Sequence, residues 1–380
     1  MDYINFDANA GHTLLSSVRS FLADFDGAAR NPSSVHRGGQ AARVLIEEAR
    51  DRVSTLLRLP PSYRVVFTSG ATEANNLAFY LATCGHAAGT ILTTAVEHPC
   101  VLASADHAAG HGFQIRSLTV QRNGTLTPLP QDIGSELRFA SLMLANNETG
   151  HCFPVEALAR AIRSKAPHCV LHSDVVAALG KMAIAPAELR LDMATISGHK
   201  VGALTGVGAL IVDTTRVQCR SLLRGGPQEL RWRAGTENVL GIASLGVAAK
   251  EIHERQDEIM KRLSRQRRMV LQMLEELLPD TIVHHAANGA IDSTISVRVT
   301  GCPADDLVVA ADTRGLHISS GAACASGKPE SSHVLRGMGF DDTHASETIR
   351  ISLELFMDDS VVERGMEILA ECVATMRGAQ

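Results

Sequence analysis

Between residues 60 and 215 the chain alternates short apolar segments, rich in β-branched residues, with stretches of helical periodicity. This alternation predicts a mostly parallel β-sheet covered by helices, because a parallel connection needs a crossover helix. The predicted strands are 64–67, 90–94, 114–120, 139–145, 169–172, 193–196 and 208–212, and the predicted helices between them are 72–82, 99–109 and 155–164. The fold class is therefore α/β, with a seven-stranded sheet.

From residue 237 to about 278 the helical pattern is longer than one compact helix, and Gly241 and Gly246 suggest a break or a packed crossing. Beyond this connector, strands at 293–299 and 348–353 and helices at 304–312 and 360–376 predict a smaller α+β unit. We expect a large domain at residues 12–255 and a small domain formed by residues 1–11 and 256–380.

Composition narrows the function classes. The 36 Lys and Arg residues against 41 Asp and Glu give a net charge of −5 without a long basic cluster, which argues against a nucleic-acid or membrane surface as partner. The chain shows no basic, apolar leader and no apolar run of membrane-spanning length, so we predict a cytoplasmic protein. Its eight cysteines have neither disulfide-framework nor zinc-site spacing and should be reduced.

In open sheets of this kind, ligands bind at the carboxyl ends of the strands. After the first strong strand comes Thr68-Ser69-Gly70-Ala71-Thr72-Glu73, where small residues and the start of a helix suit a phosphate. An ordinary helix cap explains this segment as well.

A lysine and an aspartate follow two further strands. Lys200 ends the segment Ser197-Gly198-His199-Lys200, in which Ser197 and His199 are suited to bind phosphate, and Asp174 comes just after the strand predicted at 169–172. A lysine can form a Schiff base, and a carboxylate keeps a pyridinium nitrogen protonated. Together with the phosphate loop, this order indicates pyridoxal phosphate, although a lone lysine is usually a solvated surface charge.

Other polar residues occur at the same predicted sheet edge or inside strands. His98 is placed to stack on an aromatic cofactor and move protons, or to serve as a core or cap histidine. The loop 146–150, which contains Asn147, is either a ligand loop or a tight turn. Arg350 lies inside an apolar strand, where a carboxylate clamp and a structural ion pair are equally good explanations.

One cysteine stands apart from the rest. Cys324 is surrounded by small residues in Ser319-Ser320-Gly321-Ala322-Ala323-Cys324-Ala325-Ser326-Gly327, which suits a nucleophile on a moving loop, or equally a packed turn. The other seven cysteines are expected to be packing residues. The pairs His107 and His111, and His284 and His285, have no third ligand at suitable spacing, so we predict no metal site.

Read together, these segments resemble the cysteine desulfurases, pyridoxal-phosphate enzymes of fold type I in the class V aminotransferase superfamily, and specifically the nitrogen-fixation and iron-sulfur-cluster types. The resemblance runs along nearly the whole chain, through residues 30–36, 68–75, 97–98, 146–150, 174, 197–200, 233–238, 319–324, 334–336 and 349–350.

The resemblance implies a role for each matching position. Lys200 would be the Schiff-base lysine, Asp174 the pyridinium partner and His98 the stacking, proton-transferring histidine. The phosphate would be held by Ala71 (through its backbone), Thr72, Ser197 and His199, with Thr236 contributed by the second subunit of a homodimer. Asn147 and Arg350 would bind the carboxylate of L-cysteine. Cys324 would take its sulfur as a persulfide for an acceptor protein, leaving L-alanine.

The sequence also departs from the family pattern. Ala10-Gly11-His12 replaces Ala-Thr-Thr, and Ala177 stands where the family has a glutamine that bonds the cofactor's phenolic oxygen. Two alternatives therefore stay open: a selenocysteine lyase or other class V enzyme, and a weakly active paralogue that acts as a sulfur-transfer scaffold. The identity of the sulfur acceptor is open as well.

Overall fold

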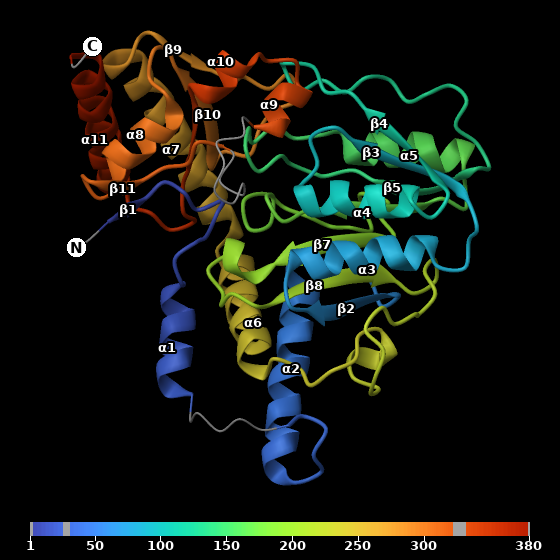
Figure 1. Ribbon diagram of the computed structural model, residues 1–380. Coiled ribbons are helices and arrows are strands. Elements are labelled where there is room, and N and C mark those ends of the chain that lie inside the picture. The colour runs from blue at the N-terminus through green and yellow to red at the C-terminus, as the bar shows by residue number, and fades with distance from the viewer. Residues whose placement is uncertain (1–2, 26–30, 322–331, 379–380) are drawn as a thin grey trace.

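The computed structural model of the chain describes residues 3–25, 31–321 and 332–378. Its central feature is the predicted seven-stranded sheet, in the strand order β2-β8-β7-β6-β5-β3-β4 (Figure 1). The strands from β7 to β4 pair in parallel, whereas β8 is antiparallel to both β2 and β7. The members are β2 (Tyr63–Thr68), β3 (Gly89–Thr94), β4 (Phe113–Leu118), β5 (Leu137–Ser141), β6 (Val170–Asp174), β7 (Met193–Ser197) and β8 (Gly208–Asp213).

All seven predicted strands are present, with shifted ends, and two of these shifts matter for the site. The strand predicted at 139–145 ends at Ser141. Its two neighbours are β3, which ends at Thr94, and β6. Beyond Ser141 the chain keeps backbone hydrogen bonds to β6 only. Strand β6 continues to Asp174, so this carboxylate belongs to the last position of the strand rather than to the loop after it.

Both faces of the sheet are buried, which explains why its strands are apolar at nearly every position. Alternate residues such as Val66 and Phe139 pack with α3 (Ala71–Thr83) and α4 (Pro99–Ala109) in one cluster. Their neighbours Val65 and Ala140 belong to a second cluster, to which α2 (Arg37–Leu56), α5 (Val155–Lys165) and α6 (Val239–Glu254) contribute. The sheet is thus the middle layer of three.

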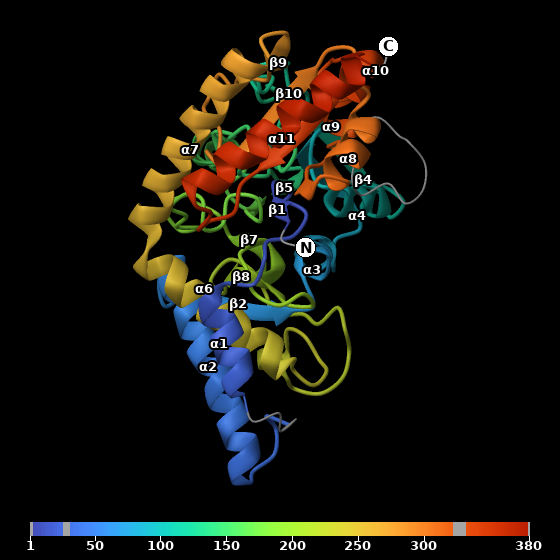
Figure 2. The ribbon, with the colours of Figure 1, turned by 90° about the vertical axis from the view of Figure 1, so that its left-hand side faces the viewer.

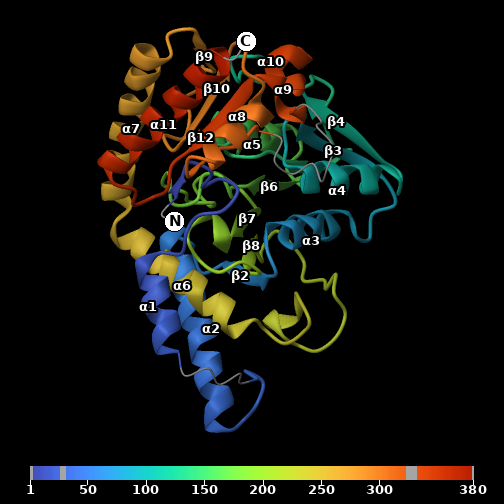
Figure 3. The same cartoon turned by 60° about the vertical axis from the view of Figure 1, so that its left-hand side comes forward.

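The long helical pattern after residue 237 forms two helices. The break falls at Arg255, between α6 and α7 (Gln256–Leu277), and not at either glycine. Gly246 instead allows the close crossing of α6 with α2, since a Cβ there would lie 2.5 Å from the Cα of Ala49. Helix α1 (Ser16–Asp24) also packs on α6, and the three helices lie together in Figure 3.

Two small sheets complete the fold. The order β12-β10-β9 forms an antiparallel sheet, and β1 pairs in parallel with β11. Helices α7 and α11 lie side by side (Figure 2). The residue bounds are β1 (Ile4–Asn5), β9 (Thr281–Val283), β10 (Thr294–Val299), α8 (Ala304–Asp312), β11 (Leu316–His317), α9 (His333–Gly337), α10 (Asp342–Ser346), β12 (Thr348–Ser352) and α11 (Asp359–Gly378).

The first strand of the chain therefore pairs with a strand more than three hundred residues later. The predicted domain boundaries, 12–255 against 1–11 and 256–380, stay a prediction. Within the described ranges, no helix is both long and apolar enough to cross a membrane.

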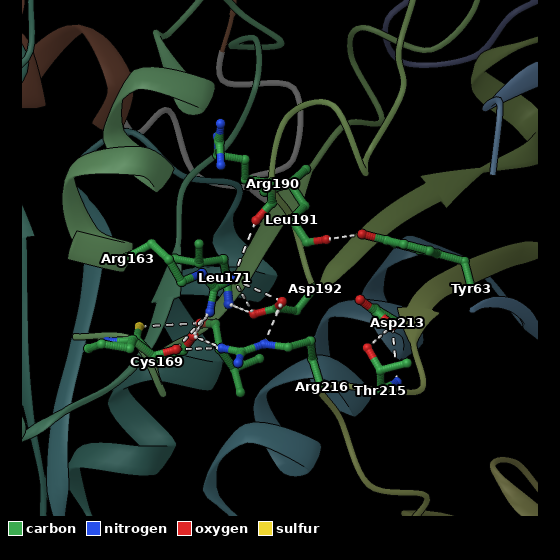
Figure 4. Close-up of polar contacts among 12 residues, drawn as sticks. Tyr63, Arg163, Cys169, Leu171, Arg190, Leu191, Asp192, Asp213, Thr215 and Arg216 are labelled. Atoms are coloured by element: carbon green, nitrogen blue, oxygen red, sulfur yellow. Dashed lines mark hydrogen bonds and ion pairs between the residues drawn. The ribbon is translucent and has the colours of Figure 1, made fainter. Parts of the chain in front are cut away.

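A buried carboxylate organises the amino ends of the parallel strands (Figure 4). Asp192, directly before β7, accepts hydrogen bonds from Arg163 at 2.9 Å, from Arg216 at 3.3 Å and from the backbone N–H of Leu171 in β6 at 2.8 Å. Tyr63 donates its hydroxyl to the carbonyl of Leu191 nearby, at 2.6 Å. These contacts fix β6 and β7, whose opposite ends carry Asp174 and Ser197.

A buried histidine links three adjacent strands. His172 in β6 forms hydrogen bonds with the hydroxyls of Ser141 in β5, at 2.9 Å, and Thr195 in β7, at 3.0 Å. Burial lowers the pKa of His172 to about 3, so its ring is neutral in the folded protein.

Because His172 stays neutral in the folded protein, we expect the free energy of unfolding to fall in acid. The unfolded chain takes up a proton at His172 below its ordinary pKa of about 6.5, while the folded chain does not, so each pH unit from 6.5 down to about 3 costs about 1.4 kcal/mol. Urea unfolding of His172→Gln should show a pH dependence weaker by that amount, with exposed His168→Gln as control. An identical pH dependence of wild type and His172→Gln would contradict this account.

Candidate active site

A cavity of about 810 Å³ lies at the carboxyl ends of the parallel strands. It brings together most of the predicted site residues from distant parts of the chain: Ala71, Thr72, His98, Asn147, Asp174, Ser197, His199, Lys200 and Arg350. Thr236 is exposed and does not belong to the lining that the described residues form. Cys324 lies outside the described residues.

The amino end of α3 forms one wall of the cavity. Gly70 caps the helix, and Ala71 and Thr72 occupy its first turn, where backbone N–H groups have no partner within the helix. Strand β8 approaches this loop closely, since a Cβ on Gly208 would lie 2.8 Å from the Cα of Gly70. The wall therefore offers free amides and a positive helix end to an anion.

An ion pair braces this loop from outside. Glu73 accepts from the Arg233 guanidinium at 2.7 Å and from the backbone N–H of Ser69 at 2.8 Å. Burial alone would raise the pKa of Glu73, but the hydrogen bonds from Arg233 and Ser69 outweigh it and lower the pKa. The segment that carries Thr236 is thus tied to the loop at the start of α3.

Asp174 lies buried at the end of β6. Its carboxylate accepts from the Asn75 side chain of α3 at 2.8 Å and from the backbone N–H of Val176 at 3.0 Å. Asn75 in turn has a buried Oδ1 with no hydrogen-bond partner among the described residues. The contacts of Asp174 fix its orientation and leave it at the cavity surface, able to bind a protonated ring nitrogen.

His98 is both the cap of a helix and a cavity residue. Its Nδ1 accepts the backbone N–H of Cys100 at 3.2 Å, so the proton of the neutral ring is on Nε2. Burial lowers the pKa of His98, Lys200 and His333 lower it further, and Asp174 acts in the opposite direction. The ring is therefore neutral, with an Nε2 proton that it can donate, because Nδ1 already accepts the N–H of Cys100.

The lysine end of the cavity is the short 3₁₀ helix η1 (Gly198–Lys200). The amine of Lys200 donates to the main-chain carbonyls of Asn9 and Ala10, the latter at 2.8 Å. His199 pairs with the hydroxyl of Ser197 at 3.0 Å, and burial together with Lys200 lowers the pKa of His199 to about 4.

Arg350 in β12 is buried and reaches the cavity from the three-stranded sheet. It donates to Asp7 at 2.6 Å and to the carbonyl of Asn147 at 3.3 Å. Its Nε is buried without a hydrogen-bond partner among the described residues. The ion-pair explanation of Arg350 is therefore correct, and the guanidinium keeps a further N–H on each of Nη1 and Nη2 for a bound carboxylate.

The structure adds site residues that sequence reasoning missed. Lys181 and Glu148 are buried in the cavity wall, and His333 lies beside them at the start of α9. Lys181 stands inside the apolar run Ala177-Ala178-Leu179-Gly180-Lys181-Met182, a context that signals a buried lysine. Glu148 falls within the loop 146–150 that the sequence marks as a candidate ligand loop, whereas His333 carries no comparable signal.

The two departures from the family pattern both fall near this cavity. Ala177 is part of its wall, and its methyl group offers no hydrogen bond. His12 lies farther back. Its ring Nε2 accepts the backbone N–H of Leu355 at 2.9 Å, and its backbone N–H donates to the carbonyl of His199 at 3.0 Å. Residues 10–12 thus connect the lysine loop to the chain that follows β12.

The remaining cysteines and histidines are distributed over the molecule. The described cysteines are free thiols, and Cys219 is exposed, so the expectation that all seven are packing residues is wrong at that position. In the described part of the chain, no three His, Cys, Asp or Glu side chains group together as a metal site would require.

The donor set fits pyridoxal phosphate. One cavity contains an anion-binding helix end, a buried carboxylate, an imidazole and a lysine amine. It is large enough for the cofactor and a small amino acid. The fold and the site define a pyridoxal-phosphate-dependent enzyme of fold type I.

Comparison with known proteins agrees and narrows the class. Residues 5–364 match the family model "Aminotransferase class-V", and the chain belongs to that family. It is 34% identical to a cysteine desulfurase of Nostoc, an alignment covering 99% of this chain and 94% of the relative. A NifS-like protein structure superposes with a TM-score of 0.89 at 27% identity, covering 98% of this chain and 100% of that one.

A third comparison is with a structure whose name includes its ligand. The structure named "SspA in complex with cysteine" has a TM-score of 0.78 and 26% identity, and covers 94% of this chain and 100% of its own. Within the family the chain is an enzyme of the cysteine desulfurase type, and the selenocysteine-lyase and scaffold alternatives are not favoured.

Proposed function

We propose that this chain converts L-cysteine and the thiol of Cys324 into L-alanine and a Cys324 persulfide, which an acceptor protein then receives. The observation that carries the proposal is the meeting of Lys200, Asp174 and Arg350 in one cavity with His98. The overall change balances: the bond between Cβ and sulfur of the substrate breaks, a sulfur–sulfur bond forms on Cys324, and the electron pair left on Cβ takes up a proton equivalent to the one that the Cys324 thiol loses.

The residues divide the work by their chemistry. Arg350 binds the substrate carboxylate through the remaining N–H groups of Nη1 and Nη2, assisted by the amide of Asn147. Pyridoxal phosphate, when bound, supplies an electron sink that weakens the bonds to the substrate's Cα. Asp174 holds the ring nitrogen protonated, and Ser197, His199 and the start of α3 hold the phosphate. Lys200 moves the α-proton, and the neutral His98 has an Nε2 proton to donate.

The chain segment that carries Cys324 begins and ends at this cavity. Gly321 belongs to the cavity lining, and Ser332 donates a hydrogen bond to the buried carboxyl of Glu148. His333 donates to the carbonyl of Glu97, next to His98, at 3.0 Å. These anchors on both sides support Cys324 as the sulfur acceptor within the chain.

A homodimer with shared sites completes the proposal. Thr236 is exposed and lies outside its own cavity, although Arg233 ties its segment to the α3 loop. The preceding segment exposes Leu222, Leu223 and Leu230, as a subunit interface would require. We also infer a cytoplasmic location, supported by the free thiols of the described residues, because a persulfide must be renewed in a reducing compartment.

Replacement of the nucleophile should separate sulfur transfer from cofactor binding. In Cys324→Ala, alanine formation and sulfide release from L-cysteine with dithiothreitol should fall by at least about a hundredfold, because no thiolate takes the sulfur. The absorbance of bound pyridoxal phosphate should be unchanged. Exposed Cys219→Ala is the control and should keep full activity. Full activity in Cys324→Ala would refute the proposed role.

Arg350→Lys should impair substrate binding, because a lysine cannot hold Asp7 and a carboxylate in the same planar geometry. We expect kcat/KM for L-cysteine to drop about 10- to 100-fold, mostly through KM. The control Arg298→Lys, in neighbouring β10, alters an ion pair with Glu347 outside the cavity. An unchanged KM in Arg350→Lys, with a normal unfolding midpoint, would contradict the carboxylate-binding role.

Mixed dimers test the sharing of Thr236. Lys200→Ala and Thr236→Val subunits should each be inactive or nearly so as homodimers. If Thr236 serves the partner's cavity, a heterodimer of the two contains one intact site, so mixing should restore up to half of wild-type activity per heterodimer. If Thr236 serves its own cavity, both sites stay defective, and no gain on mixing would contradict the proposal.

A further inference from the structure

A second lysine amine lies in the cavity wall. Lys181 is 4% exposed and stands in the turn after β6, seven residues beyond Asp174. Its Nζ donates to the side-chain oxygen of Asn9 at 2.7 Å. Burial, together with the charges of Lys200 and Arg350, lowers the pKa of Lys181 to about 7. Burial of an amine is costly, so a buried lysine in the wall of a ligand cavity is a candidate functional residue.

Asn9 connects Lys181 to the reacting groups. Its Nδ2 donates to the carbonyl of Asn147 at 2.8 Å and to the hydroxyl of Thr294 in β10 at 2.9 Å. Its main-chain carbonyl accepts the amine of Lys200, and its N–H donates to Ser352 in β12 at 3.0 Å. One buried residue thus contacts the reacting lysine, the substrate loop and the strand that carries Arg350.

The direction of the Asn9 amide depends on Lys181. An ammonium group only donates, so the oxygen of the amide must face Lys181 and the nitrogen must face Thr294 and Asn147. Without this donor the buried oxygen loses its partner, and the amide is held from its nitrogen side alone, by the carbonyl of Asn147 and the hydroxyl of Thr294. The carbonyls of residues 9 and 147, which hold Lys200 and Arg350, would move with it.

We propose that Lys181 is a positioning residue for the reaction: through Asn9 it fixes the carbonyls that hold Lys200 and Arg350, and its charge acts on the Lys200 amine. The proposal rests on the proposed function for its kinetic readouts and on the cofactor site alone for its spectroscopic readout. The charged and titratable groups around Lys181 are Lys200, Arg350 and His12. Lys200 and Arg350 are cations, so the positive charge of Lys181 disfavours a proton on the Lys200 nitrogen. Loss of the Lys181 charge therefore favours that proton.

The test uses the enzyme loaded with pyridoxal phosphate, in the variants Lys181→Met, Asn9→Ala and the double variant, with exposed Lys165→Met as control. We expect Lys181→Met to lower kcat/KM for L-cysteine at least about tenfold, with KM raised. The pH midpoint of the bound cofactor's absorbance should rise in Lys181→Met. In the double variant kcat/KM should stay within about twofold of the worse single variant, because both residues act through one contact.

Three results would overturn the proposal: unchanged kcat/KM in a folded Lys181→Met, losses that multiply in the double variant, or a lower unfolding midpoint with an unchanged absorbance titration. If Lys181→Met does not fold, Asn9→Asp decides, since it keeps the acceptor for Lys181 and removes both donors of Nδ2. Unchanged kcat/KM there overturns the proposal. Failure of the wild-type enzyme to form alanine would instead refute the proposed function, with the absorbance shift still measurable.

Discussion

The ion pair between the buried Arg350 and the half-buried Asp7 is the contact on which the site depends. It joins the amino-terminal segment to β12, and Asn9, two residues later, joins the same segment to β10, the 147 loop and Lys200. Removing Asp7 would leave the buried Arg350 charge without its partner, which costs about 3–5 kcal/mol in a fully buried pair and less here, where Asp7 is partly exposed. This segment lies between the large sheet and the three-stranded sheet, and Asn9 and Ala10 form part of the cavity wall.

The electrostatics of the cavity suit an anionic ligand in a neutral acid–base environment. Lys181, Lys200, Arg336 and Arg350 line the cavity together with Glu73 and Asp174, and burial raises the pKa of a third carboxyl there, that of Glu148. His98 and His199 have lowered pKa values, because burial and the nearby lysine disfavour further positive charge. A cofactor phosphate and a substrate carboxylate compensate the excess of cations, and neutral imidazoles are left to hold and move protons.

Local sequence patterns could predict the fold and the strand-end residues, because both follow from short-range rules. A parallel sheet places Asp174 and Ser197–Lys200 at one edge whatever the details of packing. Lys181 and Asn9 could not be predicted in this way, since the contact between them spans 172 residues and depends on how the amino-terminal segment folds back. The strand predicted at 139–145 was too long for a related reason, as its end is set by where its neighbour β3 stops.

The central claim is that this site moves sulfur from L-cysteine to Cys324. Mass spectrometry of the peptide that contains Cys324, after the loaded enzyme is mixed with L-cysteine and alkylated without reductant, tests it directly. We expect an added mass of one sulfur atom on Cys324, together with free alanine, and no such addition in Lys200→Ala. Alanine formed without any sulfur on Cys324, or sulfur found on Cys219 in its place, would contradict it.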